Sequence, residues 1–204
     1  MNLISAYYQG EDPFNIFNKI SSTMKPHHLT GKNEVLILWG GEDISPALYN
    51  QSVVYARASN QPSTRDIVEK HLFQRAVDLD MPIIGICRGA QLACALSGGT
   101  LFQHIGGGHH SNHKVDTKDG HTFTTSSCHH QALNLDNVPN ELLAWDRERT
   151  TRVYTDKEEL ETIIPEVVYI PSTKSFCIQG HPEWMSPTSP FVTWCAKQIK
   201  ERFF

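Results

Sequence analysis

Two short apolar runs stand out in the chain, and each is closed by small residues. Val35–Trp39 runs into Gly40-Gly41, and Ile83–Ile86 runs into a second turn. Continuous apolar runs of this length, bounded by turn residues, predict strands that are buried on both faces of a parallel sheet. Between them, apolar residues recur at helical spacing after Ser63, which predicts a connecting helix. The order strand, helix, strand indicates a sheet covered by helices on both faces.

Weaker patterns predict the remaining elements. We expect strands at Met1–Tyr8, Leu142–Trp145, Val167–Ile170 and Ser175–Gln179, a hairpin over Val115–Thr125, a loop at Ile105–His110, and helices at Pro13–Ile20 and Phe191–Phe204. The 204 residues fit the length of one α/β domain, and the chain contains no repeat, low-complexity tract or linker. We therefore expect a single domain over residues 1–204.

Candidate chemistry lies at the ends of the two clearest strands, where parallel sheets bind their ligands. Cys87 follows the strand Ile83–Ile86 directly and precedes a helix of small residues. A tight strand-to-helix turn presents its side chain alone, and Gly85 and Gly89 allow backbone to approach that turn closely. The helix N-terminus would favour a thiolate by lowering the thiol pKa. We predict a nucleophile at Cys87; the alternative is a buried structural cysteine.

A cysteine nucleophile needs a base, and the base needs an orienting partner. His181 and Glu183 follow the predicted strand Ser175–Gln179 with Pro182 between them. Proline holds the preceding residue extended, so side chains two apart point to the same side. His181 can then face Cys87 while Glu183 holds its other ring nitrogen.

Composition limits the partners and the compartment. The formal net charge of −4 gives no electrostatic reason for binding nucleic acid or an anionic membrane, and no apolar run is long enough to span a bilayer. The N-terminus does not resemble a signal peptide. Five cysteines, an odd number at wide spacing with no CxxC, argue against disulfides or a thiolate zinc site. We therefore expect a cytoplasmic protein.

Histidine is unusually frequent, because seven of the eleven histidines fall between His104 and His130. A metal site could draw on His109, His110, His113, His129 and His130. Structural zinc sites, however, usually pair ligands compactly with cysteine or carboxylate, and no such spacing is clear here. Part of the cluster also lies in a glycine-rich stretch that we expect to be exposed. We therefore predict no metal site and no cofactor.

Together these motifs resemble class I glutamine amidotransferases, and within them the γ-glutamyl-γ-aminobutyrate hydrolase-like group, also called peptidase C26. No single motif is specific, but their order is. The matching segments are Gly40–Pro46, Arg65–Asp66, Gly85–Gln91, Gly98–Leu101, Ser127–Gln131 and Gln179–Glu183. Their spread covers most of the domain. The stretch Val153–Glu161 is charged and matches the group poorly.

The resemblance implies a flavodoxin-like α/β sandwich and hydrolysis of a γ-glutamyl amide through a thioester on a Cys87–His181–Glu183 triad. It implies an oxyanion hole made by the backbone N–H groups of Gly41 and Arg88. The arginine could instead bind an anion through its side chain, but donation from its backbone alone is the simpler role. Residues implied to contact the glutamyl group are Gln91, His129, His130 and Gln131.

Three functions remain open from the sequence. The first is a free-standing hydrolase that releases glutamate from a small γ-glutamyl amide. The second is a glutaminase subunit that delivers ammonia to a separate synthetase or ligase, since the chain has no GxxxxGK[ST] motif for ATP. The third is a non-catalytic binding relative, which the intact triad disfavours.

Overall fold

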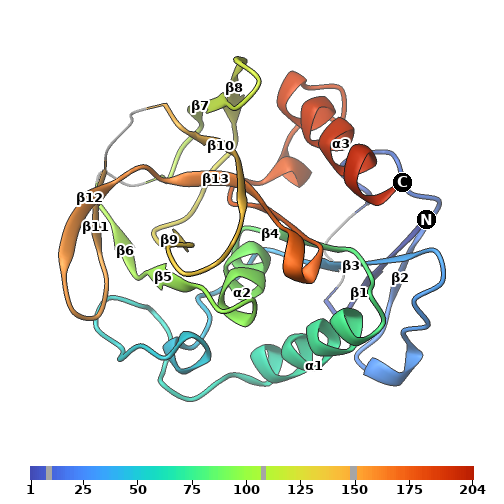
Figure 1. Cartoon of the computed structure of the whole chain (residues 1–204), viewed down its shortest axis with the longest axis horizontal. Helices are drawn as coiled ribbons and strands as arrows, with labels where there is room; N and C mark the ends of the chain where they lie inside the picture. Colours follow the sequence, from blue (N-terminus) through green and yellow to red (C-terminus); the bar gives the residue numbers. More distant parts are fainter. Residues whose placement is uncertain (8–10, 107–108, 148–150) are drawn as a thin grey trace.

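A mixed nine-stranded sheet organises the described part of the chain (Figure 1). The structure is a computed structural model that describes residues 1–7, 11–106, 109–147 and 151–204. The sheet order is β2-β1-β3-β4-β14-β13-β10-β7-β8. Its strands are β1 (Asn2–Ser5), β2 (Ile20–Ser22), β3 (Glu34–Leu38), β4 (Ile83–Ile86), β7 (His113–Thr117), β8 (Thr122–Thr125), β10 (Glu141–Asp146), β13 (Pro165–Ile170) and β14 (Ser175–Ile178).

The sheet has a parallel half and an antiparallel half. Neighbouring strands from β2 to β14 pair in parallel, and those from β14 to β8 pair antiparallel. The two clearest sequence predictions, β3 and β4, lie side by side in the parallel half. The predicted strands near 142, 167 and 175 and the hairpin near 115–125 are confirmed as β10, β13, β14 and β7–β8.

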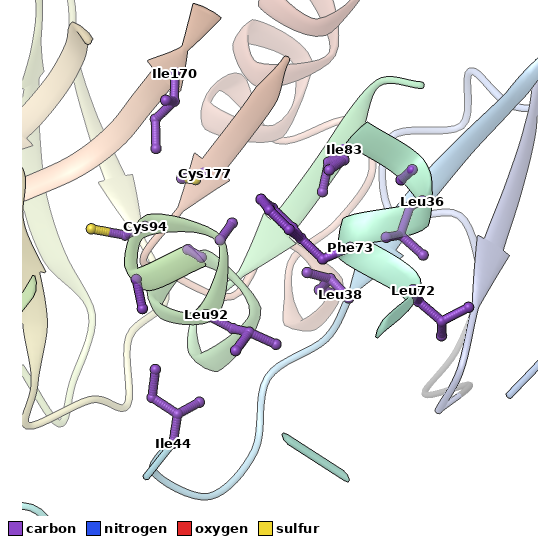
Figure 2. Packing of buried hydrophobic residues seen from close by; sticks show 14 of the residues in the cluster. Leu36, Leu38, Ile44, Leu72, Phe73, Ile83, Leu92, Cys94, Ile170 and Cys177 are labelled. Atoms are coloured by element: carbon purple, nitrogen blue, oxygen red, sulfur yellow. The ribbon is translucent and has the colours of Figure 1, made fainter. Parts of the chain in front are cut away.

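One face of the sheet is covered by α1 (Thr64–Asp78) and α2 (Arg88–Leu96). The start of α1 is fixed by a capping box, in which the Ser63 hydroxyl accepts from the Asp66 N–H while the Asp66 side chain accepts from the Ser63 N–H. Phe73 of α1 lies between that helix and α2, near Leu38 of β3 (Figure 2). Burying an apolar side chain of this size contributes roughly 1.5–3 kcal/mol to folding.

The opposite face is covered by α3 (Pro190–Phe203), which Figure 1 shows across the strands from α1. Its buried residues Phe191, Cys195 and Ile199 pack with Trp39 and the side chains of β3, β4 and β14 that point to this side. Helices therefore cover both faces of the sheet, as the sequence pattern predicts. Among the described residues, none of the helices has both the length and the apolar character that crossing a membrane requires.

Two small sheets lie beside the main one, and the sequence pattern does not predict their pairing. One contains β6 (His104–Ile105), β11 (Thr151–Tyr154) and β12 (Glu159–Thr162), and the other pairs β5 (Thr100–Phe102) with β9 (Ala132–Asn134). The charged stretch that matches the family poorly is thus largely an antiparallel hairpin, β11–β12. The predicted loop at Ile105–His110 includes the end of β6, and its residues 107–108 lie outside the described residues.

The helix predicted at Pro13–Ile20 is wrong. The Asp12 carboxylate accepts hydrogen bonds from the backbone N–H groups of Phe14, Ile16 and Phe17, which curls this segment into a turn. Asn15 within it has a φ of 51°. An aspartate that binds nearby backbone N–H groups competes with the helical hydrogen-bond pattern, and a left-handed residue ends it.

Candidate active site

The carboxyl ends of three adjacent parallel strands bring the predicted site together. The central strand β4 pairs with β3 on one side and β14 on the other, with Ile86 opposite Ile178. The chain continues from these strands into Gly40, Cys87 and His181, so segments more than ninety residues apart meet at one edge of the sheet.

Cys87 stands at a strained turn between β4 and α2. Its φ is 49° and its ψ is −108°, values that a residue with a side chain rarely adopts. A Cβ at Gly85 would lie 2.6 Å from the carbonyl oxygen of Gly89, and one at Gly89 would overlap the backbone of Leu38. The prediction that both glycines allow a close backbone approach at this turn is therefore confirmed.

The thiol itself differs from the sequence-based expectation. Cys87 is only 5% exposed, and burial raises its pKa to about 12. A hydrogen bond from the Arg88 N–H opposes this rise, and the negative charge of Glu183 adds to it. The favourable field of the helix N-terminus is thus outweighed by desolvation, which disfavours any buried charge. At neutral pH the resting thiol is protonated.

His181 is held in place from several directions. Its Nδ1 lies 2.7 Å from Glu183 Oε1, and its ring stacks flat on Trp184 with the ring centres 3.6 Å apart. Its backbone N–H donates to the carbonyl of Ser126, whose hydroxyl donates to the His181 carbonyl. A Cβ at Gly40 would meet His181 Cε1 at 2.8 Å and Cys87 Cβ at 3.6 Å. The imidazole and the cysteine therefore border the same glycine.

Hydrogen bonds from an arginine side chain hold the Gly40-Gly41 turn in place. Arg65 Nη2 donates to the carbonyls of Trp39 and Gly40, each at 3.0 Å. Gly41 has a φ of 152°, and a Cβ there would collide with the guanidinium of Arg65. In a trans peptide the N–H points opposite to the preceding carbonyl, so the Gly41 N–H points away from Arg65.

The side chain of Arg88 takes no part in the cavity. It is fully buried and forms ion pairs with Asp66 and Glu69 of α1, while Glu69 also pairs with Arg65 at 3.2 Å. Buried charges persist only when they are paired in this way. The use of this side chain to bind an anion, which the sequence left open, is therefore wrong, and its backbone N–H remains the group that faces the sulfur.

A cavity of about 270 Å³ opens beside Cys87. His130 Nε2 lies 2.9 Å from Asp43 Oδ2 at this cavity, and Gln91 Nε2 donates to the Gln131 carbonyl at 3.4 Å. The structure thus brings the four predicted substrate residues to one place, next to the predicted nucleophile. The lining residues are Gly41, Glu42, Asp43, Arg57, Cys87, Gln91, Cys128, His129, His130 and Gln131.

Four of these lining residues are absent from the sequence-based site: Glu42, Asp43, Arg57 and Cys128. Partial burial alone would raise the pKa of Glu42, but its own backbone N–H and the positive charges of Arg88 and Arg65 lower it, which keeps the carboxylate ionised. Glu42 and Asp43 were within reach of sequence reasoning because they sit inside the Gly40–Pro46 motif. No local pattern marks Arg57, whose loop has no periodicity.

The histidine cluster also departs from expectation. His109, expected in an exposed glycine-rich stretch, is 8% exposed, and its backbone pairs with that of His129. Both imidazoles approach the buried carboxylate of Glu166, and burial lowers the pKa of His129. The neighbouring His110 is exposed, as predicted.

Comparison with known proteins gives the class first. A protein of Thermoplasma acidophilum assigned as part of a GMP synthase shares the fold, with a TM-score of 0.61 and 15% identity over 98% of this chain and 96% of its own. Together with the motifs, the α/β flavodoxin-like fold places the chain in the class I glutamine amidotransferase superfamily. Within it, the Peptidase C26 family model matches residues 19–144, and the chain belongs to that family.

Curated relatives match shorter segments. A glutamine amidotransferase-like protein of Rickettsia prowazekii is 42% identical over 74 residues, which are 35% of this chain and 25% of that protein. The carbamoyl phosphate synthase small chain of Buchnera aphidicola is 28% identical over 114 residues, 55% of this chain and 27% of its own. The matched segments thus span about a quarter of the length of these relatives.

Proposed function

We propose that this protein hydrolyses a γ-glutamyl amide bond, in glutamine or a γ-glutamyl amine, with Cys87 as the nucleophile. The observation that carries the proposal is that Cys87 and the imidazole of His181 border the same point: a Cβ built on Gly40 would lie 3.6 Å from Cys87 Cβ and 2.8 Å from His181 Cε1. Glu183 orients this imidazole at 2.7 Å. A nucleophile, a base and an orienting carboxylate are the parts that acyl transfer by cysteine needs.

Activation begins from a neutral thiol. Because burial raises the pKa of Cys87 to about 12, a stored thiolate is disfavoured, and the proton must move as the substrate carbonyl is attacked. His181 accepts this proton at Nε2, and Glu183 stabilises the resulting imidazolium through Nδ1–H. The imidazolium then protonates the departing nitrogen, leaving a γ-glutamyl thioester on Cys87.

Deacylation reverses these roles. A water molecule loses a proton to His181 and attacks the thioester carbonyl, and the carbon–sulfur bond breaks to release glutamate and the thiol. In both steps the carbonyl oxygen becomes negatively charged. The Gly41 N–H, which points away from Arg65, and the Arg88 N–H beside the sulfur are the proposed donors. Losing one such donor typically raises the barrier by about 2.7–4 kcal/mol.

Recognition of the glutamyl head requires partners for an α-ammonium and an α-carboxylate. The cavity offers the ionised carboxylate of Glu42 and the guanidinium of Arg57, which have the opposite charges. Gln91, His129, His130 and Gln131 line the same cavity and offer polar groups to the substrate. A volume of about 270 Å³ suits one small amino acid.

The second candidate is a glutaminase subunit of a larger synthetase. One of the similar proteins is a small chain of carbamoyl phosphate synthase, and this chain exposes consecutive apolar residues at Val53, Val54 and Tyr55. This segment precedes Arg57 of the cavity, so a partner bound there would contact the site. In either role, the free thiol of Cys87 calls for a reducing compartment such as the cytosol.

A screen of γ-glutamyl amides and free glutamine for glutamate release tests the proposal. Cys87→Ala should lower turnover by about a thousandfold or more, His181→Ala nearly as much, and Glu183→Gln less, because it only orients the base. The matched control is Cys94→Ala. Cys94 is also a buried cysteine; it lies on α2 and outside the cavity. Full activity in folded Cys87→Ala would overturn the mechanism.

The same screen separates the two candidates. A free-standing hydrolase turns over a γ-glutamyl amine unassisted. A glutaminase that serves a synthetase shows low activity on glutamine alone, and that activity rises when the synthetase is added.

A further inference from the structure

We propose that His109, His129 and Glu166, with His113 beside them, bind one divalent transition-metal ion of the zinc type behind the cavity. The three first-named groups each offer a ligand atom, and these atoms lie within 4.8 Å of one another. Three ring nitrogens face the same oxygen, Glu166 Oε1: His109 Nδ1 at 3.1 Å, His113 Nε2 at 3.1 Å and His129 Nε2 at 3.7 Å. The proposal does not rest on the amidase chemistry, although His129 also lines the cavity beside Cys87.

The first argument comes from His129, whose side chain is 1% exposed. Its Nδ1 lies 2.8 Å from the Gln131 carbonyl oxygen, so Nδ1 carries the hydrogen and donates it. In the neutral ring, Nε2 then carries a lone pair, and that lone pair faces the Glu166 carboxylate. Among the described residues, Nε2 has no hydrogen-bond partner in this buried place, and Glu166 Oε1 lies 3.7 Å from it. Two buried acceptors that face one another are stabilised by a cation between them.

The second argument is that His109 and His113 repeat this arrangement. His109 directs Nδ1 to Glu166, while its Nε2 lies 2.9 Å from Asp146 Oδ2. His113 directs Nε2 to Glu166, while its Nδ1 lies 3.4 Å from the Ser111 carbonyl. Metal-binding histidines usually donate their second N–H to a carboxylate or a backbone carbonyl, which fixes the tautomer. All three imidazoles here have such an acceptor on the side away from Glu166.

The spacing and the ligand types favour zinc. With bonds of about 2.0–2.1 Å, neighbouring ligands of a tetrahedral zinc ion lie roughly 3.3 Å apart. The three contacts to Glu166 Oε1, at 3.1, 3.1 and 3.7 Å, bracket that separation. Two imidazoles and one carboxylate, with a third imidazole beside them, suit zinc rather than magnesium or calcium, which prefer oxygen ligands. Glu166 is fully buried, which excludes a site that is merely a surface cluster of acids.

The ligands come from separate elements. His113 lies on β7, Glu166 on β13, and His129 in the segment that lines the cavity through His130 and Gln131. An ion at this place would tie the sheet to the wall of the cavity from behind, so its role is to stabilise structure.

Four preparations of the full chain, the unmodified protein and three variants, test the proposal. After removal of metal with a chelator, the protein is titrated with Zn²⁺ in a calorimeter and bound zinc is measured by mass spectrometry. We expect one equivalent of zinc and a rise in Tm of about 5 °C, because the ion binds only the folded chain. His109→Gln and Glu166→Gln should each lower the zinc affinity by at least tenfold. The control His121→Gln changes an exposed imidazole and should retain the affinity.

Binding at the thiols is the competing site. Cys87 and Cys128 both line the cavity, so the double variant Cys87→Ser/Cys128→Ser should keep its zinc. Co²⁺ bound to the unmodified protein should give the strong visible bands of a tetrahedral site without a thiolate charge-transfer band. This spectrum needs no variant that might misfold. Absence of stoichiometric zinc, loss of zinc with the thiols, or a thiolate band would each overturn the proposal.

Discussion

At the scale of the residue, Cys87 combines a strained backbone with a thiol that resists ionisation. Its left-handed φ persists because Gly85 and Gly89 let the flanking backbone close around it. Backbone strain of this kind costs of order 1–3 kcal/mol and tends to occur at functional sites. Burial, meanwhile, raises the pKa of the thiol to about 12. A sulfur held in this way stays protonated until a base accepts its proton, the role proposed for His181.

This state of the thiol predicts how alkylation depends on pH. Only the thiolate reacts with iodoacetamide, and the pKa of Cys87 is raised, so its labelling rate should rise about tenfold per pH unit from pH 7 to pH 10 without levelling off. Cys128 is exposed and should react first. Peptide mass spectrometry over this pH range measures both. A rate at Cys87 that levels off below pH 8 would contradict the prediction.

The sequence could predict these residues but not this state. Local sequence features mark Cys87, His181 and Glu183: a turn flanked by glycines, and a proline between two polar residues. Such features can be recognised without knowing the rest of the fold. The direction of the thiol pKa depends on how much solvent the folded chain excludes. That quantity is set by residues distant in the sequence, and no local pattern contains it.

At the scale of the element, α2 sits unusually close to the sheet. A Cβ at Gly89 would overlap the carbonyl of Leu38, so this helix can pack on β3 only because glycine occupies its first turn. The same close packing fixes where Cys87 lies relative to the edge of the sheet. The position of the nucleophile therefore depends on how α2 packs on β3.

Substitution of this glycine should show the effect. Gly89→Ala should lower the free energy of unfolding by about 1–3 kcal/mol, because overpacking displaces backbone rather than a flexible side chain. Gly98→Ala is the matched control: a Cβ there would come within 4 Å of none of the described residues, although a φ of 97° would strain any residue that carries a side chain. Urea denaturation measures both. Equal losses would mean that conformation, and not the close contact, decides the outcome.

Elements with a strong apolar pattern were predictable, and those defined by long-range pairing were not. The strands β3, β4 and β14 and the helices α1 and α3 follow from runs and periodicity. The charged hairpin β11–β12 has few apolar residues, and its register depends on β6, almost fifty residues earlier. The helix predicted after Asp12 was wrong because the Asp12 carboxylate binds three backbone N–H groups. Hydrophobic periodicity does not reveal such a contact.

At the scale of the whole molecule, the main sheet separates two apolar cores. One contains Phe73 and the side chains beneath α1 and α2, and the other contains Trp39 and the side chains beneath α3. Because β3 and β4 contribute to both, neither core can be lost while the other stays intact. We therefore propose that residues 1–204 form a single domain.

One domain should unfold in one step. Far-UV circular dichroism and tryptophan fluorescence, which reports largely on buried Trp39 and Trp194, should give the same urea midpoint and the same slope. Separate midpoints for the two signals would contradict the single domain. Buried aromatic residues are suitable reporters because their surroundings change only when the core opens.

Arg65 links a helix to the backbone of the site. It belongs to α1, outside the cavity, yet it holds the carbonyls of Trp39 and Gly40 and thereby dictates which way the next peptide is turned. Such a residue can change during evolution while the residues that line the cavity stay the same. A lineage that alters Arg65 would change both the peptide that presents the proposed oxyanion donor and, through the contact with Glu42 at 3.4 Å, the charge that faces the substrate.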